Sequence, residues 1–197
     1  MGAAPKTTQK RLPKDQRRAQ LIDTALAIVR EEGTEALTLG YLPERAGVTK
    51  PIAYEHFGTR AGLLIAIFRD YDDRTTDAVR AALARGGRTI EDVAAILSTA
   101  YIDCCLSMGP EVSAVFDALS ASEETKEFRT SWRDFLVEEF RKGFAPLVKM
   151  PRKKMDALLI GVIGAAAALA GEAGSGRLSR NAAVSTLQEL MIGAFRA

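Results

Sequence analysis

The spacing of residues 39 to 57 constrains the fold of this 197-residue chain more than any other feature. Two short helical segments, 39–46 and 50–57, are separated only by Gly47-Val48-Thr49. Glycine adopts the left-handed conformation that ends a helix, so Gly47 can turn the chain sharply. Thr49 can cap the second segment, and Pro51 fits its first turn because no helical hydrogen bond is lost there. The pattern predicts a helix-turn-helix.

The two faces of these segments differ in chemistry. Apolar residues at Leu42, Ala46, Val48, Ile52 and Phe57 are spaced to pack against a third element. The remaining residues are expected to face outward: Thr49, Lys50, Pro51, Ala53, Tyr54, Glu55 and His56. Hydroxyl, imidazole and ammonium groups at a helix N-terminus can donate hydrogen bonds to phosphate oxygens. The outward face therefore suggests a DNA backbone as its partner.

A family resemblance rests on these same residues. The run Arg45-Ala-Gly-Val-Thr-Lys50, then Tyr54-Glu-His-Phe57, Thr59-Arg60 and Leu63-Leu64, resembles the N-terminal domain of the TetR family of bacterial transcriptional regulators. With Ala25 and Gly33, the resemblance covers roughly residues 15 to 68 and does not extend further.

The resemblance implies roles for individual residues. Thr49, Lys50 and Pro51 would approach base edges from the first turn of the recognition helix. Thr38, Tyr54 and His56 match phosphate-contacting positions, and Arg60 stands where the family usually has lysine. His56, the only histidine, could instead be an ordinary surface side chain, and the ring of Tyr54 could pack on the core.

Three residues depart from the family pattern. Pro43 replaces a small helical residue, and Gly40 weakens the same segment, so that helix is expected to be short, kinked or late in starting. Gly62 stands where an acidic residue commonly completes a capping box with Thr59, so the next helix is expected to depend on Thr59 alone.

The whole sequence predicts an all-α protein of about nine helices in two domains, with no convincing alternating strand pattern. The expected divisions are a flexible basic arm at 1–13, the helix-turn-helix domain at 14–59, and a ligand-binding and dimerisation domain at 60–197. The first 60 residues hold 10 Lys and Arg against 7 Asp and Glu. Arg17 and Arg18, expected on the first helix, extend the candidate DNA contacts; the arm could follow DNA or simply be a solubilising terminus.

The second domain has features of a sensor body. By resemblance, it would enclose a small, mostly apolar effector among Tyr101, Cys104, Met108, Phe116, Trp132, Phe135 and Ile163, although such aromatic stripes are more often plain core. The stretch 158–171 is too short for a membrane span and is expected to be a buried helix. The resemblance implies a homodimer contact through the last two helices, and the small residues of this stretch would suit it.

The sequence offers little for enzymatic chemistry. The adjacent Cys104 and Cys105 build neither a metal site nor a disulfide framework, and a single histidine supports no nucleophile–base pair. We therefore expect no catalytic residue, metal or cofactor, and a cytoplasmic, ligand-responsive regulator, by family habit a repressor, that binds a pseudo-palindromic double-stranded DNA operator as a homodimer. The alternatives are a non-sensing architectural DNA-binding protein, an activator, or a small helical enzyme.

Overall fold

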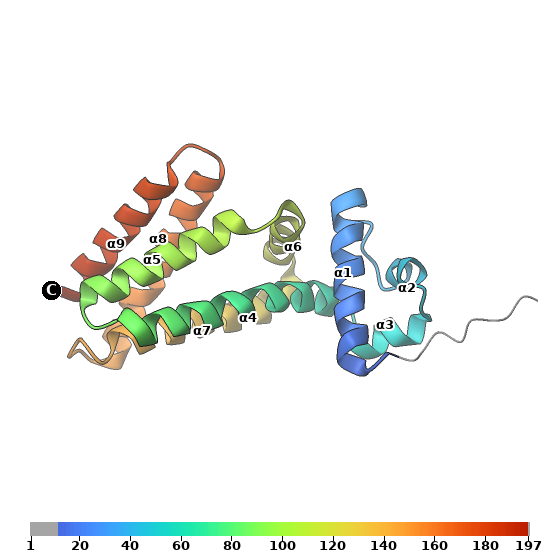
Figure 1. The fold of residues 1–197 in the computed structure, drawn as a ribbon, viewed down its shortest axis with the longest axis horizontal. Helices are drawn as coiled ribbons and strands as arrows, with labels where there is room; N and C mark the ends of the chain where they lie inside the picture. The colour runs from blue at the N-terminus through green and yellow to red at the C-terminus, as the bar shows by residue number, and fades with distance from the viewer. Residues whose placement is uncertain (1–11, 197) are drawn as a thin grey trace, which may run out of the picture. The chain divides into compact units, whose positions relative to one another are not determined.

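The computed structural model describes residues 12–196, except for the side chains at positions 74 and 75. This part of the chain is helical and contains no strand, which confirms the all-α prediction (Figure 1). Its elements are α1 (Lys14–Glu32), α2 (Tyr41–Ala46), α3 (Lys50–Phe57), α4 (Arg60–Gly86), α5 (Ile90–Ser107), α6 (Pro110–Ala121), a 3-10 turn (Glu123–Thr125), α7 (Lys126–Phe144), α8 (Arg152–Gly174) and α9 (Arg180–Arg196). The expected arm at 1–13 lies almost wholly outside the described residues.

Helix boundaries follow local chemistry. α5 begins with a complete capping box, in which the hydroxyl of Thr89 accepts from the Asp92 amide at 3.1 Å and the Asp92 carboxylate accepts from the Thr89 amide at 3.0 Å. α6 begins at Pro110, where the missing amide hydrogen costs no helical bond. α1 ends at Gly33, whose φ of 84° favours glycine.

The chain forms two compact units that divide between Ile67 and Phe68. The first contains α1, α2, α3 and the first two turns of α4. Its core consists of fully buried side chains from these helices and from the loop after α1: Leu21, Ala25, Ile28, Leu37, Leu42, Ala53 and Leu63. The division was expected at residue 60, but Leu63, Leu64 and Ile67 at the start of α4 are buried and belong to the first unit.

The second unit is built around α5. α8 and α9 form an antiparallel pair packed on α5, and α7 packs against α5 and α8 (Figure 1). Close approach of α7 to α5 depends on Gly143, since a Cβ there would lie 2.9 Å from Val93. The rings of Phe144 and Phe195 stack with centroids 4.2 Å apart and join the ends of α7 and α9.

α8 differs from the buried helix that the sequence suggested. Leu159, Val162, Ile163, Ala166 and Ala170 are buried, but the opposite side is exposed. Ile160 on that side is 47% exposed, and Gly161 and Gly164 have open space where a side chain would be. Among the described helices, α8 is long and apolar enough to cross a membrane. The bent pair of α5 and α6 also is, if the two are counted as one span. Core helices often have the same length and composition.

Candidate functional site

α2 and the turn that follows it position the candidate reading helix. α2 begins only at Tyr41, so Pro43 falls in its first turn, and the predicted late start is confirmed. The Thr38 hydroxyl accepts from the Tyr41 amide at 3.1 Å. Gly47 then takes φ 67° and ψ 34°, the predicted left-handed conformation, and the Val48 amide donates to the Pro43 carbonyl at 2.9 Å.

The first turn of α3 is open to solvent. Thr49, Lys50 and Pro51 are exposed, and Tyr54 one turn later is 53% exposed. Two expectations were wrong here. Thr49 precedes the helix in extended conformation, but its hydroxyl makes no capping hydrogen bond. Ala53 is fully buried, because positions 53 and 57 lie on the same face of the helix and pack inward together.

His56 lies in a positively charged environment. Burial lowers the pKa of His56; Glu55 acts in the opposite direction, and Lys14, Arg18 and Arg17 lower the pKa further. The N-terminal turn of α1 and the end of α3 are therefore close enough to interact electrostatically, and together they present positive charge. Arg17 and Arg18 therefore lie near enough to His56 to act on its charge.

Arg60 has a different environment from the one the resemblance implied. Its Nε donates to the Leu37 carbonyl at 2.9 Å, and its Nη2 donates to the Thr34 carbonyl at 2.6 Å. The guanidinium therefore ties the loop before α2 to the start of α4. Two of its nitrogens already serve the protein itself, which argues against Arg60 as a phosphate contact.

Arg45 is a further structural residue that the sequence did not single out. Its guanidinium bonds Glu31 at 2.6 Å, and it also bonds Glu32 and the Tyr41 hydroxyl. The bonds to Glu31, first, and to Tyr41 raise the pKa of Arg45. They fix the end of α1 to α2 and so help to hold the helix-turn-helix in place.

The second unit contains a cavity of about 440 Å³. Five of the seven expected ligand residues line it: Tyr101, Cys104, Met108, Phe116 and Trp132. Phe135 and Ile163 do not. The Phe135 ring lies under the Arg80 guanidinium at 6.0 Å, and Ile163 is buried in the core. The α7 residues that line the cavity share one helix face: Trp132, Leu136, Glu139 and Phe140. Phe135 lies on a different face of the helix.

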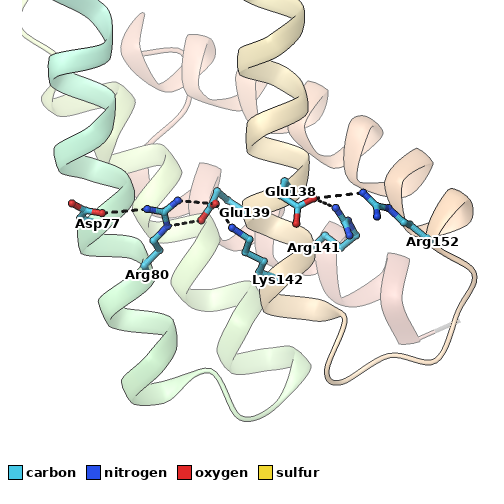
Figure 2. Close-up of polar contacts among 7 residues, drawn as sticks. All are labelled: Asp77, Arg80, Glu138, Glu139, Arg141, Lys142 and Arg152. Carbon is cyan, nitrogen blue, oxygen red and sulfur yellow. Dashed lines mark hydrogen bonds and ion pairs between the residues drawn. The ribbon is translucent and has the colours of Figure 1, made fainter.

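An ion pair lies at the cavity wall, where Glu139 is one of the lining residues. Arg80 on α4 donates to both Glu139 oxygens on α7, at 2.8 and 2.9 Å, and Lys142 donates to the same carboxylate at 2.7 Å (Figure 2). Hydrogen bonding from Arg80 is the main reason that the pKa of Glu139 is lowered to about 2. Glu138 points to the other side of α7, where it pairs with Arg141 and Arg152 (Figure 2).

Sequence reasoning missed several cavity residues. They include Phe68, Tyr71 and Asp72 on α4, and Leu97, Leu136, Glu139 and Phe140 on α5 and α7. Phe68 and Asp72 share a helix face four residues apart, which was a usable signal. Cys105 also lines the cavity, and burial raises the pKa of its thiol to about 12, so this cysteine is an unreactive, protonated wall residue.

These features define an all-α protein with an N-terminal helix-turn-helix and a hollow helical body. The sequence model described as "Bacterial regulatory proteins, tetR family" matches residues 21–67. The activator FasR of Mycolicibacterium smegmatis is 37% identical over 73 residues, which cover 37% of this chain and 33% of FasR. The regulator BetI of Rhizobium meliloti is 32% identical over 85 residues, 43% of this chain and 42% of BetI. These alignments span less than half of either relative.

Solved structures match almost the whole chain in fold. A transcriptional regulator of Pseudomonas aeruginosa gives a TM-score of 0.72 at 15% identity, covering 97% of this chain and 96% of the other. The fatty acid degradation regulator FadR of Bacillus halodurans gives a TM-score of 0.67 at 18% identity, covering 95% of this chain and 99% of the other. Residues 21–67 therefore match the TetR family of bacterial regulators, the rest of the chain shares the fold of the solved regulators, and the curated relatives named here are transcriptional regulators.

Proposed function

We propose that this protein is a ligand-responsive transcriptional repressor that binds a pseudo-palindromic DNA operator as a homodimer. The observation that carries the proposal is the exposed first turn of α3. Thr49, Lys50 and Pro51 are open to solvent at a helix N-terminus, with Tyr54 one turn behind them. A helix presented in this way can enter a major groove with its N-terminal residues at the base edges.

Backbone binding would come from residues around that turn. The Tyr54 hydroxyl and the His56 imidazole can donate to phosphates, and Arg17, Arg18 and Lys14 add positive charge near His56. Thr38 is exposed at the start of α2 and can add a further contact. Arg60 is left out of this set because it bonds the loop carbonyls.

The exposed side of α8 and α9 supports the homodimer. Ile160 and Leu190 are 47% and 46% exposed, and Gly161 and Gly164 leave room for another backbone. One reading helix buries too little surface for strong specific binding, whereas two helices about 34 to 36 Å apart read successive half-sites on one face of the duplex. The second copy is therefore functionally required.

A small effector in the cavity would release the DNA. α4 carries both Leu63 and Leu64 of the first unit's core and Phe68, Tyr71 and Asp72 of the cavity wall. A ligand that prefers one position of α4 would change the affinity for DNA, typically by about 1 to 3 kcal/mol. With DNA as its partner, the protein would act in the cytoplasm.

The test is selection of bound fragments from a genomic DNA pool, followed by anisotropy titrations on the recovered site and on random DNA at graded salt. Tyr54→Phe should weaken binding to both DNAs alike, and Lys50→Ala should cost about 1 to 3 kcal/mol and relax the preference at particular base pairs. Tyr101→Phe removes the same hydroxyl from a cavity tyrosine and is the matched control. Absence of specific binding at low salt would refute the regulator.

A further inference from the structure

The cavity contains a compact cluster of aromatic rings. Phe68 lies 5.4 Å from Phe116 and 5.3 Å from Trp132, and Phe116 lies 5.8 Å from Trp132, all between ring centroids. The three residues come from α4, α6 and α7 and line the same cavity. Ring faces of this kind attract cations through their quadrupoles as well as binding apolar groups.

A carboxylate lies beside this ring cluster. Asp72 follows Phe68 by one turn of α4 and lines the cavity with it. Burial raises the pKa of Asp72, the Trp132 indole acts in the opposite direction, and Asp73 adds to the rise. The buried Nε1 of Trp132 has no hydrogen-bond partner of good geometry in the described part of the chain. The Trp132 indole therefore lies close enough to the Asp72 carboxylate to act on it, without forming a well-shaped hydrogen bond.

The charges on the cavity wall have one sign. Among its described residues the charged ones are Asp72 and Glu139, and neither lysine nor arginine lines it. Glu139 is already neutralised by Arg80 and Lys142. None of the described residues that influence Asp72 is a cation. Among the described residues, Asp72 is thus the cavity carboxylate that lacks a counter-ion, and a half-buried carboxylate of this kind favours a positive partner.

We propose that the cavity binds an apolar amine or quaternary ammonium compound, with its cationic group against Asp72 and its apolar body among Phe68, Phe116 and Trp132. This inference rests on the proposed function, because it names the chemical class of the effector. A carboxylate ligand of the same shape is disfavoured, since it would bring a second negative charge to Asp72 without a basic side chain on the wall to offset it.

The test uses three probes with one apolar body: 4-phenylbutyltrimethylammonium, 4-phenylbutanol and 4-phenylbutanoate. Calorimetric titration of the full chain without DNA should show the cation binding at least about tenfold more tightly than the alcohol, and the carboxylate most weakly. Asp72→Asn should reduce the preference for the cation to about threefold or less. Asp72→Glu, which keeps the charge, should retain it.

Asp73→Asn is the matched control, because this neighbouring carboxylate is exposed and does not line the cavity. It should leave the preference unchanged. Equal or tighter binding of the carboxylate, an undiminished preference in a folded Asp72→Asn protein, or no binding of any probe at millimolar concentration would overturn the inference. DNA affinity is measured separately, so loss of operator binding alone would refute the proposed function and not the ligand class.

Discussion

Arg80 on α4 and Glu139 on α7 form a two-point ion pair, with the Nε and Nη2 of Arg80 at 2.8 and 2.9 Å from the two carboxylate oxygens. The side chain of Glu139 is only 11% exposed, whereas that of Arg80 is 49% exposed. The pair joins two helices that both line the cavity. Its state of charge should therefore affect the stability of the second unit and the shape of the ligand site.

The ion pair predicts a specific loss of stability in acid. Because the pKa of Glu139 falls from its ordinary 4.5 to about 2, its stabilisation is fully present above about pH 4.5 and is lost as the pH falls toward 2. The contribution should be on the order of 2 kcal/mol, since water partly screens Arg80. Denaturant unfolding should show Glu139→Gln destabilised by that amount at pH 7, with the difference shrinking toward pH 3. Glu127→Gln, exposed on the same helix, should match the parent protein at both pH values.

Replacing Arg60 should lower the stability of the protein without weakening DNA binding. Lysine keeps the charge but cannot serve both the Leu37 and Thr34 carbonyls, so Arg60→Lys should lower the free energy of unfolding by about 1 kcal/mol. Operator affinity of the folded variant should change less than twofold. Arg88→Lys is the control, as Arg88 is exposed beyond α4. If the urea midpoint is unchanged and operator binding is weaker, Arg60 contacts a DNA phosphate instead.

Adding a single methyl group at Gly62 should lower the stability of the protein substantially. A Cβ at this position would lie 2.1 Å from the Phe57 carbonyl oxygen, so Gly62→Ala requires a backbone shift. Helix propensity alone would favour alanine by about 1 kcal/mol, yet we expect a net destabilisation of about 2 kcal/mol or more. Gly86→Ala, where the nearest atom is 3.7 Å away, should be tolerated. Thermal unfolding decides the matter, and a stabilised Gly62→Ala protein would contradict the close approach.

Gly62 also shows where sequence reasoning stops. The sequence predicted correctly that Thr59 alone begins α4, and the Gly62 amide does donate to the Thr59 hydroxyl at 3.0 Å. It gave no reason for the glycine, because the obstacle is the Phe57 carbonyl folded back over the turn. A local signal such as Gly47 predicted a helix boundary well, since the end of α2 depends on the conformation of that one residue. Asp72 shares a helix face with Phe68, but that spacing alone gave it no role, because its significance also depends on Trp132, sixty residues away in sequence.

A larger side chain on the exposed face of α8 should leave the single chain stable but weaken its self-association. Gly164 has open space around it, so Gly164→Gln should preserve or slightly raise the stability of the isolated chain through better helix propensity. If a second copy packs there, the added side chain should weaken self-association at least tenfold in sedimentation equilibrium. Ala84→Gln, exposed on α4, provides the comparison. A monomeric parent protein at micromolar concentration would remove the homodimer altogether.

His56 predicts a pH dependence of operator binding. Burial and the nearby Lys14, Arg18 and Arg17 lower its pKa, so the imidazole is neutral in the free protein at pH 7.5. A neighbouring phosphate would raise the pKa in the complex, and binding would then take up a proton. Operator affinity should therefore increase as the pH falls through the interval between the two pKa values, by about threefold from pH 7.5 to 6.5. His56→Gln should lose this slope while binding DNA, whereas an equal slope in the variant would assign the proton to another group.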